Sequence, residues 1–405
     1  MNEKQDSLRD SLRTFPPGAW ILFAGSFLNK FGTFVLPFLA IYMTRLGYTT
    51  AQAGIAIGAY GVGTLAAALL GGWLADRFGR RRTIVLSMFT GAATMLWLSQ
   101  ARSLGGITCL AALAGLFGEL YRPACSALLT DLVPAAHRVT AFAAYRIAIN
   151  AGFAFGCATA GLLAEKSFIW LFAGDALSSV LFGLVALLAL PAGRPRSEEH
   201  QGLLHNWRIL RQDAELRRVL ASSLVIGLVF VQLFSTMSLE ITRNGFSATT
   251  YGAIISFNGA LVVLFELPLA SITRRFRPVP VMALGYVLIG LGFASNAMDR
   301  TVPLLVLTTA MFTLGEMIAL PVSTAYVADL APPDQRGMYM GLYGLVWALA
   351  FIAGPSLGMG LFSVSPVALW LGCGVFGALA SALILGGART PRRLACLSAV
   401  PSEGA

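Results

Sequence analysis

The chain has 405 residues, of which 57% are hydrophobic and 12% are charged. Soluble globular domains average about 45–50% and about 25%, so this composition excludes a soluble domain and indicates a membrane protein. The formal net charge of +10 could indicate a nucleic-acid partner, but the basic residues are distributed between the apolar segments as a topology signal, so we expect no nucleic acid.

Twelve apolar segments are long enough to cross a bilayer, which takes about 20 residues. In chain order they span 19–43, 51–75, 83–101, 105–130, 139–163, 168–191, 219–242, 250–273, 279–297, 302–328, 337–362 and 366–388. We therefore predict an all-α membrane protein with two six-helix bundles. The expected parts are an N-terminal tail (1–18), the first bundle (19–191), a linker (192–218), the second bundle (219–388) and a C-terminal tail (389–405).

The basic residues predict the orientation of these spans. With both termini in the cytoplasm, most of the 29 Lys and Arg residues fall on cytoplasmic segments, as the positive-inside rule requires. The first apolar run is too long for a signal-peptide core, so residues 1–18 are expected to remain as a cytoplasmic tail. The exterior loops are short and lack an Asn-x-Ser/Thr sequence, which indicates a bacterial inner membrane protein.

The two halves repeat each other at a constant offset of 198 residues. Gly54 and Gly61 correspond to Gly252 and Gly259, and Pro123 corresponds to Pro321. Parallel repeats about a central axis are typical of secondary transporters, in which the substrate site lies near the midplane between the halves. Function is therefore expected at the contact between the bundles.

The loop between the second and third spans reads Gly-Trp-Leu-Ala-Asp-Arg-Phe-Gly-Arg-Arg-Arg over residues 72–82. It resembles the signature loop of the major facilitator superfamily, and the twelve spans, the repeat and the linker extend the resemblance over essentially the whole chain. The resemblance implies alternating access by rocking of the two bundles. It also implies a latch that closes the cytoplasmic side, in which Asp76 faces a helix N-terminus near Gly337. The residues assigned to this latch are Gly72, Asp76, Arg77, Gly79 and Arg80.

Ionisable side chains inside spans cost about 2.5–3.5 kcal/mol at mid-helix, so each is a candidate for function. Glu316 has no basic neighbour on its own helix, and desolvation favours the neutral form of such a carboxyl group. It is the first candidate for a coupled proton. Glu119 is three residues from Arg122 and is expected to pair with it. Glu266 lies nearer the cytoplasm and fits a proton site or a gate equally.

Other polar and aromatic positions are expected to line the substrate cavity. Arg146 either reaches the cytoplasmic surface or points into the cavity and meets a carboxylate or an anionic substrate. The cavity residues assigned are Lys30, Arg122, Arg146, Asn150, Phe234 and Asn258. Small residues that allow close helix packing are expected to form a hinge against the opposite half; these are Gly152, Gly156, Gly354, Pro355 and Gly358.

The sequence predicts neither a cofactor nor a metal site. The five cysteines show no metal-ligand spacing, and the three histidines fall outside the spans. The chain also lacks a phosphate-binding loop that ends in Gly-Lys-Ser/Thr, so ATP is not the expected energy source. We expect a monomeric transporter and not an enzyme, with a small-molecule substrate, protons and membrane lipids as its partners.

The resulting functional prediction is proton-coupled efflux of amphipathic organic compounds, as in the drug:proton antiporter group. Three alternatives remain open. A symporter or facilitator for a small metabolite would need more polar cavity residues. A lipid or lysolipid translocator would favour a basic cavity. A non-transporting sensor would be expected to add a soluble domain.

Overall fold

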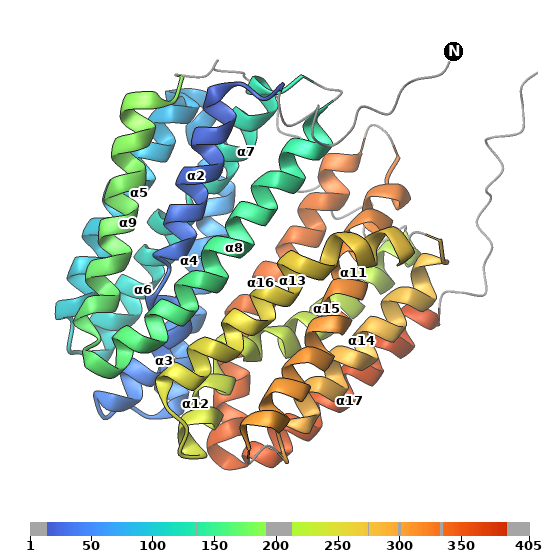
Figure 1. Ribbon diagram of the computed structural model, residues 1–405. Helices are drawn as coiled ribbons and strands as arrows, with labels where there is room; N and C mark the ends of the chain where they lie inside the picture. The colour runs from blue at the N-terminus through green and yellow to red at the C-terminus, as the bar shows by residue number, and fades with distance from the viewer. Residues whose placement is uncertain are drawn as a thin grey trace, which may run out of the picture.

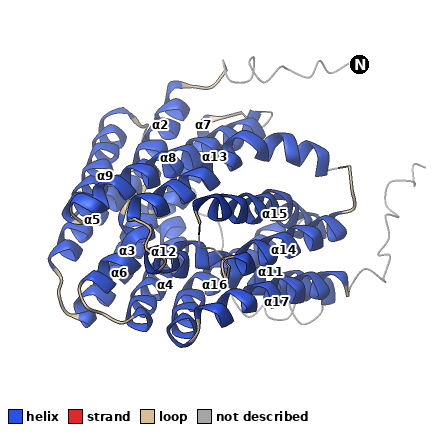
Figure 2. Cartoon of the chain, turned by 60° about the horizontal axis from the view of Figure 1, so that its bottom comes forward, coloured by secondary structure: helices blue, strands red, loops and turns tan. Residues whose placement is uncertain are grey.

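The structure is a computed structural model that describes residues 14–134, 137–191, 213–273, 275–298, 301–332 and 335–386. Most of the predicted N-terminal tail, most of the linker and all of the predicted C-terminal tail lie outside these residues. Within them the regular structure is helical throughout (Figures 1 and 2). Twelve helical segments are long and apolar enough to cross a membrane, which confirms the predicted all-α fold.

The helices of the first half follow the predicted order, and two of its spans are interrupted. The bounds are α2 (Pro17–Phe31), α3 (Val35–Arg45), α4 (Thr50–Phe78), α5 (Arg80–Gln100), α6 (Leu104–Glu119), α7 (Tyr121–Leu132), α8 (Arg138–Lys166) and α9 (Ile169–Ala189). The α6–α7 break follows from Pro123, which has no N–H to donate to the carbonyl four residues earlier, that of Glu119.

The second half repeats this plan, with an interruption in its first span. Its elements are α11 (Ala214–Phe230), the 3-10 turn η2 (Val231–Phe234), α12 (Thr236–Arg243), α13 (Ala248–Thr273), α14 (Pro278–Ser295), α15 (Val302–Leu330), α16 (Arg336–Val364) and α17 (Pro366–Leu385). Helix α11 begins before residue 219, the expected start of the bundle. The reason is an N-cap, because the Asp213 carboxylate accepts hydrogen bonds from the backbone N–H groups of Glu215 and Leu216 at 3.0 Å.

The two bundles lie side by side in Figure 1, with the first half in blue to green and the second in yellow to red. They meet along two seams, α4 against α16 and α8 against α13. We call the face at which α2 begins and α17 ends the terminal face, and the other side the opposite face. The substrate site is thus sought between these four helices.

Glycines close the α4–α16 seam near the opposite face. A Cβ atom at Gly54, Gly58 or Gly61 would lie 2.7–2.8 Å from a backbone oxygen of α16, so only glycine allows this approach. In addition, the Ser356 hydroxyl donates to the Gly54 carbonyl at 3.2 Å. Nearer the terminal face, Gly72 of α4 meets open space. The seam is therefore closed at the opposite face and open at the terminal face.

The α8–α13 seam is closed at the same end. A Cβ atom at Gly252 would lie 2.4 Å from the Cys157 carbonyl oxygen. The Ser256 hydroxyl donates to the Ala154 carbonyl, and the Thr249 N–H donates to the Glu165 carboxylate at 3.1 Å. Both seams are thus closed at the opposite face, and the α4–α16 seam is open toward the terminal face.

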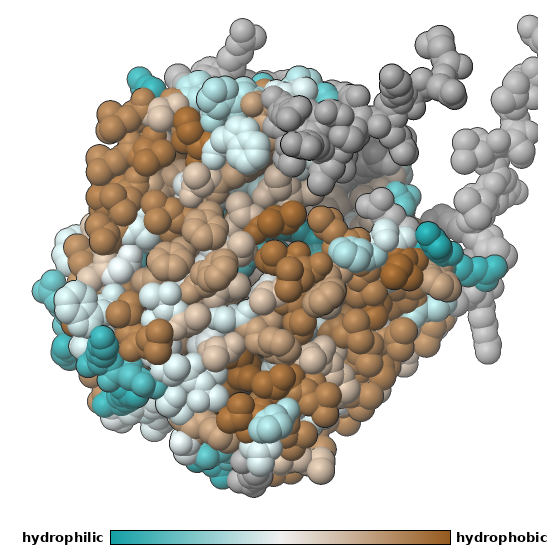
Figure 3. Space-filling view, in the orientation of Figure 1, coloured by the Kyte–Doolittle hydropathy of each residue, from teal (hydrophilic) through white to brown (hydrophobic). Residues whose placement is uncertain are grey.

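The outer surface is apolar along the flanks of both bundles, where Figure 3 is mostly brown. Large side chains such as Leu177, Leu188 and Leu307 are exposed there. Many large apolar side chains are exposed in this way, which matches a lipid environment.

Candidate functional site

A large cavity lies between α4 and α16 and has a volume of about 910 Å³. It occupies the half of the seam that is open to the terminal face. Gly341 and Gly344 of α16 meet open space there, as Gly72 of α4 does. The cavity is lined by Leu36, Tyr60, Gly61, Thr64, Leu65, Ala68, Leu69, Glu119, Arg122, Gly341, Leu342, Gly344, Leu345, Trp347, Ala348 and Phe351. Most of these side chains are apolar, which suits a ligand with an apolar body.

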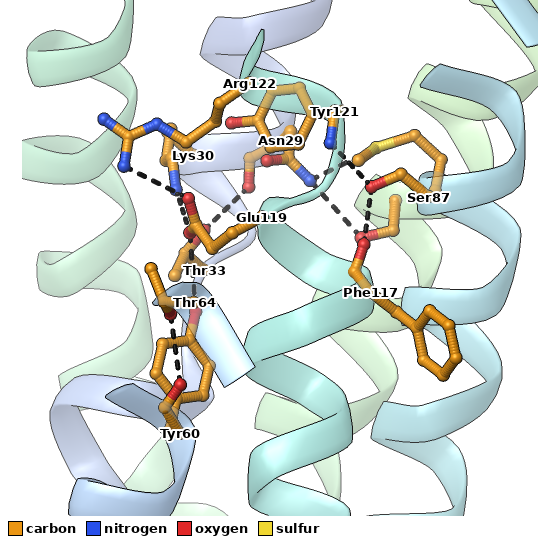
Figure 4. Close-up of polar contacts among 12 residues, drawn as sticks. Asn29, Lys30, Thr33, Tyr60, Thr64, Ser87, Phe117, Glu119, Tyr121 and Arg122 are labelled. Atoms are coloured by element: carbon orange, nitrogen blue, oxygen red, sulfur yellow. Dashed lines mark hydrogen bonds and ion pairs between the residues drawn. The ribbon is translucent and has the colours of Figure 1, made fainter. Parts of the chain in front are cut away.

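Three charged side chains of the first bundle meet beside this cavity (Figure 4). The Lys30 Nζ lies 2.8 Å from Glu119 Oε1, and the Arg122 guanidinium lies 3.2 Å from Glu119 Oε2. The expected Glu119–Arg122 pair is therefore present, with Lys30 as a second cation on the same carboxylate. The Tyr60 hydroxyl adds a hydrogen bond to Glu119 Oε1 at 3.4 Å.

The backbone explains how these groups are brought together. Glu119 ends α6 and Arg122 lies in the first turn of α7, on either side of the break that Pro123 causes. Lys30 comes from the end of α2, just before the first span is interrupted. Lys30 and Glu119 are nearly buried, whereas 55% of the Arg122 side chain is exposed. Arg122 is thus the cation that the cavity presents, and Lys30 lies behind it.

A second polar group lies in the α8–α13 seam. Arg146 of α8 forms an ion pair with Glu266 of α13, which joins the two bundles on the terminal side of the packed glycines. Both residues and Asn150 line two adjoining cavities of about 230 and about 180 Å³. Of the two positions expected for Arg146, the structure shows the one in which it meets a carboxylate.

Glu316 of α15 lines the smaller of these cavities together with Arg146 and Glu266. The Asn258 amide of α13 donates to Glu316 Oε2 at 2.9 Å and to the Thr313 hydroxyl at the same distance. In the described part of the chain, no ion pair involves Glu316. Two of the three predicted proton-site candidates, Glu266 and Glu316, therefore share one cavity, while Glu119 lies across the molecule at the other seam.

The predicted latch residues lie at the terminal face. Asp76 is half-buried near the end of α4, and its carboxylate forms no ion pair with any of the described residues. Arg77 stacks over Trp73, and Gly79 has a φ of +92° that favours glycine between α4 and α5. Arg80 pairs with Asp131 of α7 and so ties helices of its own bundle together. Since the terminal face is open here, the latch remains a prediction for the other state.

The predicted hinge and packing residues are closely packed, but the four glycines pack within their own bundle. A Cβ atom at Gly152 or Gly156 would lie 2.4 or 2.2 Å from the carbonyl oxygens of Phe27 and Phe31, which belong to the same bundle. The side chains of Val231 and Gln232, likewise in their own bundle, meet Gly354 and Gly358. Only Pro355 of the five reaches the opposite half, through its carbonyl against Gly54. The rotation of each helix decides this, and spacing alone does not show it.

The six predicted cavity residues lie in different places, and Lys30 lines only a small inner space behind the large cavity. Arg122 lines the large cavity, whereas Arg146 and Asn150 line the smaller ones. Phe234 stacks against Phe351, a lining residue, at 6.2 Å between ring centroids. Asn258 holds Glu316, as described above.

One functional neighbour was missed from the sequence, and the surroundings of Asp175 are shown only by the fold. Tyr60, beside Glu119, is the one large polar side chain in a run of small residues on α4, which was the available signal. Asp175 of α9 is buried against the backbone N–H groups of Phe34 and Val35, where α3 begins. The break between α2 and α3 puts these N–H groups next to Asp175, and the break is visible only in the folded structure.

Comparison with known proteins shows the family of the chain. The model of the Major Facilitator Superfamily matches residues 22–244 and 236–397. The chain is 26% identical over 351 residues to the uncharacterised MFS-type transporter YqjV of Bacillus subtilis, a match that covers 84% of this chain and 85% of that protein. It is 27% identical to a Na(+), Li(+), K(+)/H(+) antiporter of Planococcus maritimus, with 89% and 92% covered. It is 28% identical to the multidrug resistance protein MdtH of Aeromonas hydrophila, with 83% and 85% covered.

Solved structures show the same fold. The nucleoside transporter NupG superposes with a TM-score of 0.78 at 16% identity, covering 93% of this chain and 100% of that one. A POT family transporter in complex with 5-aminolevulinic acid gives a TM-score of 0.76 at 15% identity, covering 92% and 96%. With the family model matched over both halves, the chain belongs to the Major Facilitator Superfamily and is a multi-pass secondary transporter.

Proposed function

We propose that this protein exports amphipathic organic compounds in exchange for protons. Its proposed location is the bacterial inner membrane, with both termini in the cytoplasm. The terminal face would then be the cytoplasmic face, and the described state would be the one that loads substrate from inside the cell. Alternating access would follow from rocking of the bundles about the two seams.

The observation that carries the proton coupling is the environment of Glu316. A carboxylate removed from water must be neutralised by a cation or a proton. Asn258 offers Glu316 a hydrogen bond from a neutral amide, and the nearest guanidinium in its cavity, that of Arg146, is paired with Glu266. A proton is therefore the charge that this site is suited to exchange with the cavity.

The observation that supports an amphipathic substrate is the large cavity itself. Leucines, Trp347 and Phe351 form most of its wall, and its polar groups are few and gathered at one side. A sugar or nucleoside needs several fixed polar partners, which this wall lacks. Two relatives point the same way, since one is named for multidrug resistance and another for cation/proton antiport.

Transport into proteoliposomes tests this proposal. In antiport, an acidic lumen drives accumulation of substrate because a proton leaves as each substrate enters. Symport requires an acidic exterior instead, and facilitation equilibrates without either gradient. The panel contains cationic dyes, neutral drugs, sugars and lysolipids, with protein-free liposomes as the control for passive partition of weak bases. Accumulation of sugars alone would contradict the proposal.

Translocation of a lysolipid is the second candidate function. It is favoured by the apolar residues Leu65, Leu69 and Leu345, which give the large cavity a wall suited to an acyl chain. In the same liposomes, movement of a lysolipid between leaflets without dependence on the pH gradient would favour this candidate over drug export.

The orientation has a test of its own. A reporter that works only in the cytoplasm is expected to be active when fused to either terminus, and a reporter that works only in the periplasm is expected to be inactive there. Activity only in the periplasm would reverse the assignment of the terminal face.

A further inference from the structure

Arg122 is only partly paired at the wall of the large cavity. Lys30 and Arg122 both approach Glu119, so two cations share one carboxylate. The Lys30 ammonium is nearly buried and lies at 2.8 Å from its oxygen, whereas Arg122 lies at 3.2 Å and exposes 55% of its side chain. Arg122 is thus the cation of this cluster whose N–H donors remain open to a ligand in the cavity.

Asp175 is the other acid near this cluster, and it does not face the cavity. It is buried on α9, and its carboxylate lies against the backbone N–H groups at the start of α3. It lines a separate space of about 20 Å³ together with Lys30 and Glu119, and it is not among the residues that line the large cavity. Its charge therefore lies on the inner side of the cluster, next to Lys30.

Among the described residues that line the cavity, the second bundle offers Arg122 no counter-charge. Helix α16 contributes seven lining residues there, all of them uncharged, among them Leu345, Trp347 and Phe351. Glu119 is the only acid among the sixteen residues that line this cavity. A guanidinium in apolar surroundings favours an anionic partner, and a carboxylate or phosphate fits its fork of N–H donors.

We infer that the large cavity binds amphipathic organic anions, with the anionic head on Arg122 and the apolar body against Trp347 and Phe351. This inference rests on the proposed transport function and gives it a substrate class. A carboxylate drug from the cytosol and an anionic single-chain lipid from the adjoining leaflet share this chemistry.

Equilibrium binding tests the inference without any gradient. The full-length protein is placed in nanodiscs of phosphatidylcholine, so that no anionic lipid competes. Three fluorescent probes share a pyrene body and a butyl chain and differ only in the head group, which is a carboxylate, an alcohol or an amine. Fluorescence anisotropy against empty nanodiscs gives each affinity. We expect the carboxylate to bind about tenfold or more tightly than the alcohol. Equal affinities, or a preference for the amine, would overturn the inference.

Variants assign the preference to Arg122. Arg122→Gln is expected to abolish it, and the fold should persist because Lys30 keeps Glu119 paired. Arg122→Lys keeps a charge at the site and is expected to retain most of the preference. The matched control is Arg82→Gln, which removes the same charge from an exposed position on α5. A carboxylate preference that survives in Arg122→Gln, with thermal unfolding as in the wild type, would overturn the assignment.

Competition separates the two sources of the anion. Displacement of pyrenebutyrate by lysophosphatidylglycerol, but not by lysophosphatidylcholine of the same chain, supports the site and assigns it to a lipid. Displacement by 2-naphthoate and by neither lysolipid supports the site and assigns it to a soluble carboxylate. If none displaces the probe, the site is not anion-selective. Because binding needs no coupling ion, failure of gradient-driven transport would leave this result standing.

Discussion

Arg146 on α8 and Glu266 on α13 form an ion pair that joins the two bundles on the open side of the molecule. Glu316 lines the same cavity as this pair. Contacts that cross a seam change when the bundles rock, whereas contacts within a bundle move with it. This pair is therefore placed to respond to the transport cycle.

Removal of either charge is expected to loosen the α8–α13 seam at the terminal face. In Arg146→Gln and Glu266→Gln, the distribution of distances between spin labels at the terminal ends of these helices should broaden. The charge swap, Arg146→Glu with Glu266→Arg, should restore the wild-type distribution. A double-mutant cycle is expected to give a coupling energy of about 1 kcal/mol, because about half of the Arg146 side chain is exposed. Identical distributions in all four proteins would show that the pair does not hold the seam.

Asp76 is expected to matter only for the state that is closed at the terminal face. Asp76→Asn removes the charge and keeps the shape, so the open state described here should be unaffected while the closed state loses its attraction to a helix N-terminus. We expect a shift toward the open state and impaired transport at ordinary expression. Spin labels at the terminal ends of α4 and α16 measure the shift, and unchanged distances would count against the latch.

Glu119 is expected to be required mainly for the stability of the protein. Glu119→Gln would leave Lys30 nearly buried without its carboxylate and would weaken the hold on Arg122. Breaking a buried ion pair by removal of one partner costs about 3–5 kcal/mol, so thermal stability and expression should fall. Lys30→Met with Glu119→Gln removes both charges and is expected to recover part of the loss. A Glu119→Gln protein as stable as the wild type would show that the pair contributes little.

A larger side chain at a glycine between the bundles should change the conformation, whereas one at a glycine within a bundle should destabilise the fold. A side chain at Gly58 would meet the Ile352 carbonyl of the other bundle at 2.7 Å, whereas one at Gly152 would meet the Phe27 carbonyl of its own bundle at 2.4 Å. Gly58→Val is therefore expected to open the opposite face while the protein stays folded, and Gly152→Val is expected to lower the melting temperature. Cysteine labelling from the opposite face and thermal unfolding distinguish the two. Equal effects on both readouts would refute the distinction.

The fold could be predicted from the sequence because its signals are local. Each span is an apolar run of sufficient length, and the repeat fixes the pairing of the halves. The site could be predicted only in part, since spacing along one helix gave the Glu119–Arg122 pair but not the approach of Lys30 from α2. The four predicted hinge glycines pack closely, but within each bundle and not against the opposite half, because helix rotation depends on tertiary packing. The break before α3, and with it the place of Asp175, is likewise set by contacts between distant segments.

The most direct test of the account is gradient-driven transport by Glu316→Gln. Glutamine keeps the size and the hydrogen bond with Asn258 but cannot take up and release a proton. With whichever compound the wild-type protein accumulates in proteoliposomes with an acidic lumen, the variant is expected to lose accumulation and to retain counterflow exchange at equal pH. Accumulation that persists in Glu316→Gln and still depends on the pH gradient would contradict the account, and the coupled proton would then belong to Glu266 or Glu119.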